Sequence, residues 1–176
     1  MPPAAPAPPP RATGALLPLT LADKEGRMFT VRPFEPADRA GLEAFYDAFD
    51  PKRAAQGLPP EGPVRVARWL DGILGSGTHL VVEREGRMIG HAMLIPTGTE
   101  GMSEYAIFLD REVRGQGVGT QVNRVSVEVA RTMNVEKLWL SVEPTNRPAL
   151  RSYEKAGFRF RPGTVYSPEV EMEMVL

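Results

Sequence analysis

The sequence predicts a mixed α/β fold, and three observations indicate it. Short apolar or alternating segments, bounded by Gly, Pro and Asp, occur near the start, in the middle and at the end of the chain, as strands do. Other segments repeat apolar residues at the three- and four-residue spacing of a helix face. One long helical segment lies between two strand segments, which predicts a βαβ crossover.

The opening elements are expected to be a hairpin and two helices. Residues 20–21 and 28–33 flank the turn-rich Asp23-Lys24-Glu25-Gly26, a pattern that favours two short strands. Pro36 suits the first turn of a helix that ends near residues 50–51, and a second helix follows a Pro/Gly-rich stretch. The apolar faces are Leu42, Phe45, Tyr46 and Phe49 in the first helix, and Val66, Ala67, Leu70, Ile73 and Leu74 in the second.

The middle of the chain predicts a second hairpin, a strand and a long helix. Residues 80–82 and 88–94 flank a turn in which Gly86 is expected at a positive φ, and residues 105–109 form the next strand. Asn134 is expected as the left-handed residue that ends the long helix. Despite the β propensity of valine, one face of this helix carries Val118, Val122, Val125, Val129 and Met133.

The last segments complete the sheet. Residues 138–142 form a compact apolar strand after the long helix, which makes a βαβ unit. Pro148–Ala156 is expected as a short helix closed by Gly157, and residues 158–160 and 170–176 supply two further strands. The predicted order is strands, helices, strands, one crossover and strands.

Composition excludes several classes of protein. The 176 residues carry 21 Lys and Arg against 22 Asp and Glu, a formal charge of −1 that offers no general attraction to nucleic acid or acidic membranes. The absence of Cys excludes disulfides and thiolate metal sites and favours a cytoplasmic compartment. Neither metal-ligand spacing nor an apolar run of about 20 residues occurs. Residues 1–15 are expected to be a disordered Pro/Ala-rich tail, and residues 16–176 a single domain.

The most informative segment is the glycine-rich loop 114–120, Arg-Gly-Gln-Gly-Val-Gly-Thr, between a strand and the long helix. Alternate glycines let backbone N–H groups converge, and the helix adds unsatisfied N–H groups and the positive end of its dipole. The loop therefore suits a phosphate or pyrophosphate. A Walker A loop is excluded because the required Gly-Lys-Ser/Thr is missing, and a Rossmann fingerprint, which fails at Thr120 or Val122, is a distant alternative.

Two segments together resemble the GNAT superfamily of N-acyltransferases. Arg114, Gly117 and Gly119 form the Arg-x-x-Gly-x-Gly pattern of its acyl-CoA-binding motif. Residues 146–158, Asn-Arg-Pro-Ala-Leu-Arg-Ser-Tyr-Glu-Lys-Ala-Gly-Phe, resemble its Asn…Ala…Tyr-Glu-Lys-x-Gly-Phe segment, although Ser152 departs from the bulky apolar residue usual before the tyrosine. The resemblance covers roughly residues 28–176 and implies a mostly antiparallel sheet with flanking helices.

The resemblance implies acetyl-CoA as a co-substrate, and the lack of metal-ligand spacing in the sequence predicts no metal. The pyrophosphate would lie on the N–H groups of residues 115–120, with Arg114 adding charge, and the pantetheine arm would lie between the strand 107–109 and Asn146. The implied cofactor-binding residues are Ile107, Phe108, Leu109, Arg114, Gly115, Gln116, Gly117, Val118, Gly119, Thr120, Asn146 and Ala149.

Acyl transfer to an amine needs a neutral amine, a polarised carbonyl and a proton for the departing thiolate. Tyr153 falls at the position that commonly acts as general acid in the superfamily, and a phenol of pKa about 10 is protonated at neutral pH. Glu104 is the candidate general base, and Glu143 is the alternative. His79 and His91 lie in strand segments without a carboxylate pattern, so ordinary structural roles are expected.

The leading hypothesis is an N-acetyltransferase acting on a primary amine of a small molecule or of a protein lysine or N-terminus. Residues 29–38 and 104–109 resemble the bacterial protein-lysine acetyltransferase branch that modifies acyl-CoA synthetases. The alternative is a catalytically silent regulatory module that senses acyl-CoA. The sequence leaves open a homodimer and the acceptor, whose pocket is expected to involve residues 50–63 and 161–168.

Overall fold

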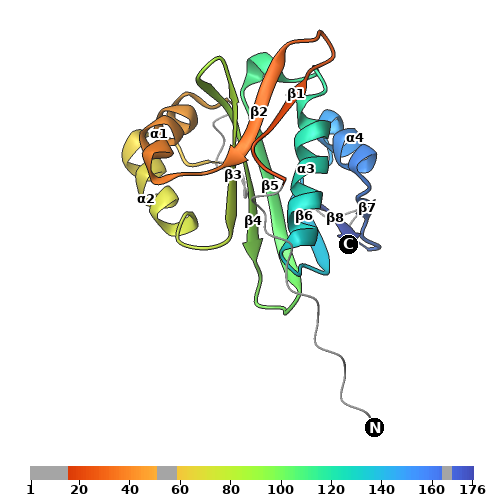
Figure 1. Ribbon diagram of the computed structural model, residues 1–176. Coiled ribbons are helices and arrows are strands. Elements are labelled where there is room, and N and C mark those ends of the chain that lie inside the picture. Colours follow the sequence, from red (N-terminus) through yellow and green to blue (C-terminus); the bar gives the residue numbers. More distant parts are fainter. Residues whose placement is uncertain (1–15, 51–58, 164–167) are drawn as a thin grey trace.

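The computed structural model describes residues 16–50, 59–163 and 168–176, and these form one eight-stranded sheet with helices on both faces (Figure 1). The strand order is β1-β2-β3-β4-β5-β6-β8-β7, and every neighbouring pair is antiparallel except β5 and β6. The predicted mixed, mostly antiparallel α/β fold with one crossover is confirmed. The tail expected at residues 1–15 lies outside the described residues.

Two hairpins form the first half of the sheet, as the turn-rich segments predict. At the tip of the second hairpin Glu85 and Gly86 have φ values of 51° and 75°. A two-residue loop of this kind needs a positive φ at both positions, so the expected conformation of Gly86 is confirmed and its neighbour shares it. The four strands are β1 (Leu19–Ala22), β2 (Met28–Pro33), β3 (Thr78–Arg84) and β4 (Arg87–Pro96).

Two helices cover one face of the sheet (Figure 1), namely α1 (Arg39–Ala48) and α2 (Pro63–Ile73). A 3₁₀ turn at Pro36–Asp38 precedes α1, so the proline stands at the start of the helical segment as expected. The predicted apolar stripes of both helices meet here. The buried residues of this core are Leu42, Phe45, Tyr46, Phe49, Val66, Leu70, Met93 and Phe108.

The opposite face is covered by α3 (Val118–Thr132) and α4 (Arg147–Ala156). Asn134 and Gly157 have φ values of 57° and 108°, which confirms the left-handed residues predicted after the two helices. Burial of the valine face against the sheet outweighs the β propensity of valine. The valines of α3 in the core are Val118, Val122, Val125, Val127 and Val129. None of the helices in the described residues is long and apolar enough to cross a bilayer.

The crossover through α3 joins β5 (Met102–Leu109) to the parallel strand β6 (Lys137–Val142). The two strands pair only where residues 102–104 lie beside residues 137–139. Within the described sheet no further pair joins β5 to β6, so the sheet opens after Glu104. The antiparallel β8 (Val170–Val175) and the short β7 (Arg159–Phe160) complete the sheet beyond β6, as the terminal segments predict.

Candidate active site

Two residues of the glycine-rich loop have a backbone conformation that favours glycine. Gly115 and Gly117 have φ values of 76° and 83°, which residues with a side chain rarely adopt. Gly117 is the N-cap of α3, and among the described residues no side chain caps that end of the helix. The N–H groups of the first turn of α3 are therefore available to an anion, and the helix dipole favours one.

Gly119 is required by packing rather than by its backbone angle. A methyl group on Gly119 would lie 3.2 Å from Leu109 Cδ1 and 3.4 Å from Ser152 Oγ, both at close contact. The absent side chain thus lets the start of α3 approach both β5 and α4. Since β5 and α4 carry the other predicted site residues, this close approach brings them to the loop.

The opening in the sheet exposes one edge of β5 beside the loop. The predicted strand residues Ile107, Phe108 and Leu109 pair with β4 on one side, through Ala92, His91 and Gly90. On the β6 side these residues have no strand partner in the described sheet. The register places Phe108 opposite His91 in the same phase as Asp110, which donates to the oxygen of Ile89, so Ile107 and Leu109 are the residues whose backbone groups face the opening. Their N–H groups are available to an extended ligand, as in β-strand addition, whereas the Leu109 oxygen accepts from Arg114.

Asn146 begins α4 on the other side of the opening. Its side-chain oxygen accepts a hydrogen bond from the backbone N–H of Ala149 at 3.3 Å, and therefore caps the helix. The structure thus brings Asn146 and Ala149, two predicted cofactor-binding residues, into contact with one another.

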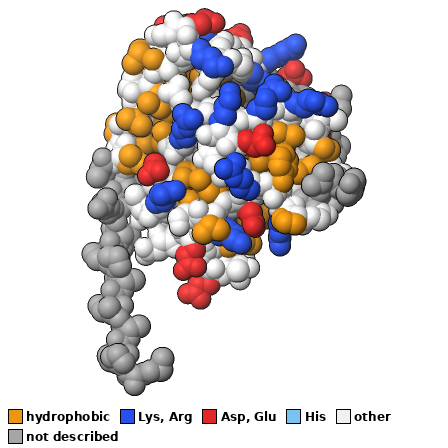
Figure 2. Space-filling view, turned by 90° about the vertical axis from the view of Figure 1, so that its right-hand side faces the viewer, with side chains coloured by type: hydrophobic (Ala, Val, Ile, Leu, Met, Phe, Trp, Pro, Cys, Tyr) orange, Lys and Arg blue, Asp and Glu red, His pale blue; other side chains and the backbone are white. Residues whose placement is uncertain are grey.

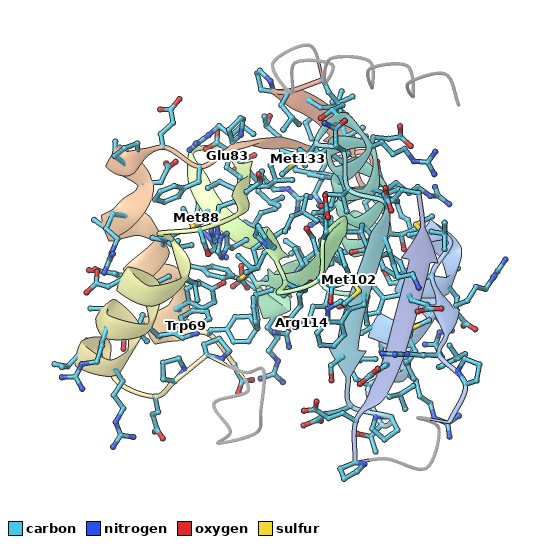
Figure 3. The ribbon with its side chains drawn as sticks, turned by 90° about the horizontal axis from the view of Figure 1, so that it is seen from below. Trp69, Glu83, Met88, Met102, Arg114 and Met133 are labelled. Carbon is cyan, nitrogen blue, oxygen red and sulfur yellow. The ribbon has the colours of Figure 1, made fainter. Side chains whose placement is uncertain are left out.

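Arg114 is exposed, but its guanidinium is bound to neighbouring backbone oxygens. Its guanidinium donates to the backbone oxygens of Leu109 at 3.0 Å and Asp50 at 2.6 Å, and lies 5.2 Å from the centre of the Phe49 ring. Figure 3 shows Arg114 between α2 and β6. Burial lowers the pKa of this guanidinium, and nearby Asp50 and Asp110 oppose that shift. In this conformation Arg114 joins the loop to β5 and to the end of α1.

Tyr153 lies on the buried face of α4. Its ring packs edge-on against Tyr105 and Phe158, with centroid distances of 6.3 and 5.9 Å. Its hydroxyl forms no hydrogen bond within the described residues. Burial raises the pKa of the Tyr153 phenol well above its usual value, so the group holds its proton throughout the neutral range. The Tyr153 hydroxyl is thus protonated and not committed to a neighbouring residue, and its role as general acid stays a prediction.

The two candidate bases differ in burial. Glu104 is partly buried where β5 and β6 part, and its pKa is raised by burial and by the nearby Glu169 carboxylate. Glu143 is exposed after the end of β6. A carboxylate with a raised pKa accepts a proton more readily, a property that the partly buried Glu104 has, and its role as the general base stays a prediction.

A hydrogen-bonded chain links the loop helix to the segment of Tyr153. Tyr105 Oη donates to Asn123 Oδ1 at 2.8 Å, and Asn123 Nδ2 donates to Ser152 Oγ at 3.0 Å. Ser152 Oγ also lies 3.2 Å from Thr120 Oγ1. The sequence signals this chain only through the serine that departs from the family pattern.

The model of the acetyltransferase (GNAT) family matches residues 42–158, which include the loop, the edge of β5 and α4. The chain belongs to this family. The resemblance predicted from the two motifs is confirmed, and GNAT enzymes use acetyl-CoA.

Named relatives within the family are distant. Mycothiol acetyltransferase of Thermomonospora curvata is 31% identical over 136 residues, 73% of this chain and 43% of that protein, so this chain spans less than half its length. The GNAT domain of PAT from S. lividans has a TM-score of 0.74 at 19% identity, covering 90% of this chain and 97% of that one. RimJ of Mycobacterium smegmatis, in complex with CoA-disulfide, has a TM-score of 0.69 at 15% identity, covering 90% and 86%. The two structures share the GNAT fold.

On the side of the GNAT sheet covered by α1 and α2, aromatic rings surround Phe108. The ring centroids of Tyr46 and Phe49 lie 5.5 and 5.6 Å from that of Phe108, and Trp69 lies 4.8 Å from Tyr46. Phe108 thus joins two regions, since it lies between Ile107 and Leu109 in β5 and its ring packs in this aromatic cluster. The intermediate exposure of Trp69 leaves part of its indole outside the core.

His79 and His91 form a one-way hydrogen-bonded chain with Tyr46. His79 Nε2 lies 3.1 and 2.9 Å from the oxygens of Ile73 and Ser76, so it must donate. A neutral His79 then accepts at Nδ1 from His91 Nε2, at 3.0 Å, and His91 Nδ1 accepts from Tyr46 Oη, at 2.6 Å. The expected structural role fits these contacts, because the chain joins both helices to β3 and β4.

Proposed function

We propose that the chain is an acetyl-CoA-dependent N-acetyltransferase that transfers an acetyl group to a primary amine by direct attack. The observation that supports it most is the coincidence of three features. The sheet opens after Glu104, the uncapped start of α3 lies beside that opening, and Tyr153 lies on α4, which packs on the same face as α3.

The residues of the opening fit coenzyme A. Backbone N–H groups at Gly115 to Thr120 would hold the pyrophosphate, because an uncapped helix start with positive-φ glycines presents convergent donors. The segment Ile107 to Leu109, in which the N–H groups of Ile107 and Leu109 face the opening, would hold the amide groups of the pantetheine arm. When bound, this co-substrate supplies an activated acetyl thioester.

The proton transfers fall to Glu104, Tyr153 and solvent. Glu104 accepts a proton from the ammonium form of the acceptor, which frees the nitrogen lone pair for attack, and releases this proton to solvent. A backbone N–H near Phe108 orients the carbonyl oxygen, on which negative charge develops. After the C–N bond has formed, the nitrogen loses its second proton to Glu104. As the C–S bond breaks, Tyr153 donates its phenolic proton to the departing sulfur, and solvent then restores the proton to Tyr153.

The acceptor is a primary amine of a small molecule or of a protein lysine or N-terminus. Of the segments expected to form its pocket, residues 51–58 and 164–167 lie outside the described residues. Among the described residues, the aromatic cluster around Phe108 lies next to the reacting position and suits an amine with an apolar body. The partly buried Glu104 beside Glu169 favours an acceptor that arrives as a cation.

The test is the release of free CoA from acetyl-CoA with a panel of primary amines. Gly117→Glu places a carboxylate at the proposed pyrophosphate site and should abolish both turnover and the rise in melting temperature caused by CoA. Val64→Glu, a matched change at an exposed position of α2, should leave both intact. Binding of acetyl-CoA without turnover with any amine would instead support the acyl-CoA-sensing module.

A further inference from the structure

The turn of the first hairpin is bonded to the glycine-rich loop. The backbone N–H of Lys24 donates to the oxygen of Gln116 at 2.9 Å. One turn into α3, Gln121 Nε2 donates to the oxygen of Ala22 at 2.7 Å. The β1–β2 turn is therefore held beside the start of α3 by two hydrogen bonds that do not involve the Lys24 side chain.

The side chain of Lys24 lies across Gly117. A methyl group on this glycine would lie 3.1 Å from Lys24 Cγ, 3.3 Å from Cε and 3.6 Å from Cδ. The aliphatic stem thus covers the α-carbon of the N-cap residue, and the ammonium group is one bond beyond Cε. Lys24 places its charge at the end of α3 whose N–H groups are uncapped.

The acidic neighbours of Lys24 are paired with arginines. Asp23 accepts from Arg27 at 3.1 Å and from Arg84 at 2.8 Å, and Glu25 pairs with Arg27 at 3.0 Å. In the described part of the chain Lys24 has no ion pair. Arg114, the basic residue of the motif, is meanwhile bound to two backbone oxygens. Lys24 is therefore the better-placed cation for a ligand at this loop.

We propose that Lys24 is a cofactor-binding residue that contacts the pyrophosphate of coenzyme A, an inference that rests on the proposed function. A diphosphate on the N–H groups of α3 carries more negative charge than the helix end offsets, and a flexible ammonium completes the neutralisation. The contact closes the site from the side of the first hairpin. Gly117 is then required both by its positive φ and because the lysine stem occupies the space of a side chain.

Another basic surface lies elsewhere on the molecule. Figure 2 shows blue Lys and Arg side chains, interspersed with other types, on the side of the molecule where α3 and α4 lie. The exposed basic residues of these helices are Arg124, Arg131, Arg147, Arg151 and Lys155. These residues are an alternative contact for the 3′-phosphate of coenzyme A, so the test must separate the two phosphate groups.

Binding of CoA, 3′-dephospho-CoA and pantetheine is compared by calorimetry in wild type, Lys24→Gln and Lys24→Arg. Lys24→Gln should weaken CoA about tenfold, because a charge-assisted contact to phosphate is lost, while Lys24→Arg retains most of the affinity. The same loss should appear with 3′-dephospho-CoA and vanish with pantetheine, which lacks the pyrophosphate. The loss should shrink at high salt.

A matched control and two contrary outcomes complete the design. Lys137→Gln, which removes a lysine paired with Glu173 at the start of β6, should leave CoA affinity unchanged. Equal CoA affinity in wild type and Lys24→Gln would overturn the assignment of Lys24. A loss seen with CoA but absent with 3′-dephospho-CoA would overturn the pyrophosphate contact. Wild-type protein that does not bind CoA at all would instead refute the proposed function, on which the assignment of Lys24 rests.

Discussion

The two faces of the sheet each bury a chain of polar side chains, but the chains differ in chemistry. Under α1 and α2 the chain runs from Tyr46 through His91 to His79. Under α3 and α4 it runs from Tyr105 through Asn123 to Ser152 and Thr120, none of which titrates near neutral pH. The histidine chain therefore makes its face sensitive to acid, whereas the amide–hydroxyl chain holds the proposed site together at any moderate pH.

Two buried tyrosines give the sharpest contrast between the faces. Tyr153→Phe keeps the ring but removes the proposed proton donor, so turnover should fall by about 10² or more, with little change in stability or CoA affinity. Turnover and CoA affinity of the same preparation check this. Near wild-type turnover would remove Tyr153 from the mechanism while leaving the fold and the loop unaffected.

Tyr46→Phe is the matched change on the other face, and it should lower stability while changing turnover little. It leaves His91 Nδ1 without its donor in a fully buried position, which should lower the free energy of unfolding by about 1 to 3 kcal/mol. Turnover at a temperature where the variant is folded should change far less than in Tyr153→Phe. Denaturant unfolding at neutral pH measures the loss.

Acid should destabilise the histidine face first. Burial, and then the neighbouring His79, lower the pKa of His91 from 6.5 to about 3. Below pH 6.5 the unfolded chain binds a proton that the folded chain refuses, so this contribution to stability is lost as pH falls from 6.5 toward about 3. The free energy of unfolding should fall by about 1.4 kcal/mol per pH unit from this group, which amounts to about 2 to 3 kcal/mol by pH 4.5.

His91→Leu is the comparison that isolates this slope. The variant is less stable at pH 7 because Tyr46 and His79 lose a partner, but its stability should vary less with pH between 6.5 and 4.5. Glu104, whose raised pKa acts in the opposite direction, is present in both proteins, so its contribution cancels. Equal slopes in wild type and His91→Leu would contradict a buried neutral His91.

The smallest expected change in stability comes from breaking the hydrogen-bonded chain of side chains beside the glycine-rich loop. Ser152→Ala removes the hydroxyl shared by Asn123 and Thr120 and should cost about 1 kcal/mol of stability, independent of pH between 5 and 8. CoA affinity should fall a few-fold, because α4 is held less firmly on α3. The melting temperature with and without CoA checks both effects, and a variant with unchanged CoA affinity would show the chain to be purely structural.

The sequence alone determined the order of elements and the loop. Hydrophobic periodicity specifies α1 to α3, since a face that must be buried repeats at the helix period whatever its partner, and Pro148 and Gly157 bound α4. The positive φ value at Gly86 was readable because glycine is the residue that tolerates it at little cost. The family motifs then indicated where the site lies along the chain.

Only the tertiary structure decided which side chains meet. The opening after Glu104, the contact of Lys24 with Gly117 and the chain from Tyr46 to His79 join residues from separate elements. No local pattern encodes such contacts, because strand register, hairpin position and helix packing are set by the whole core. Arg114 shows the same limit, since the motif fixes its place in the loop whereas packing against Phe49 and Asp50 sets its direction.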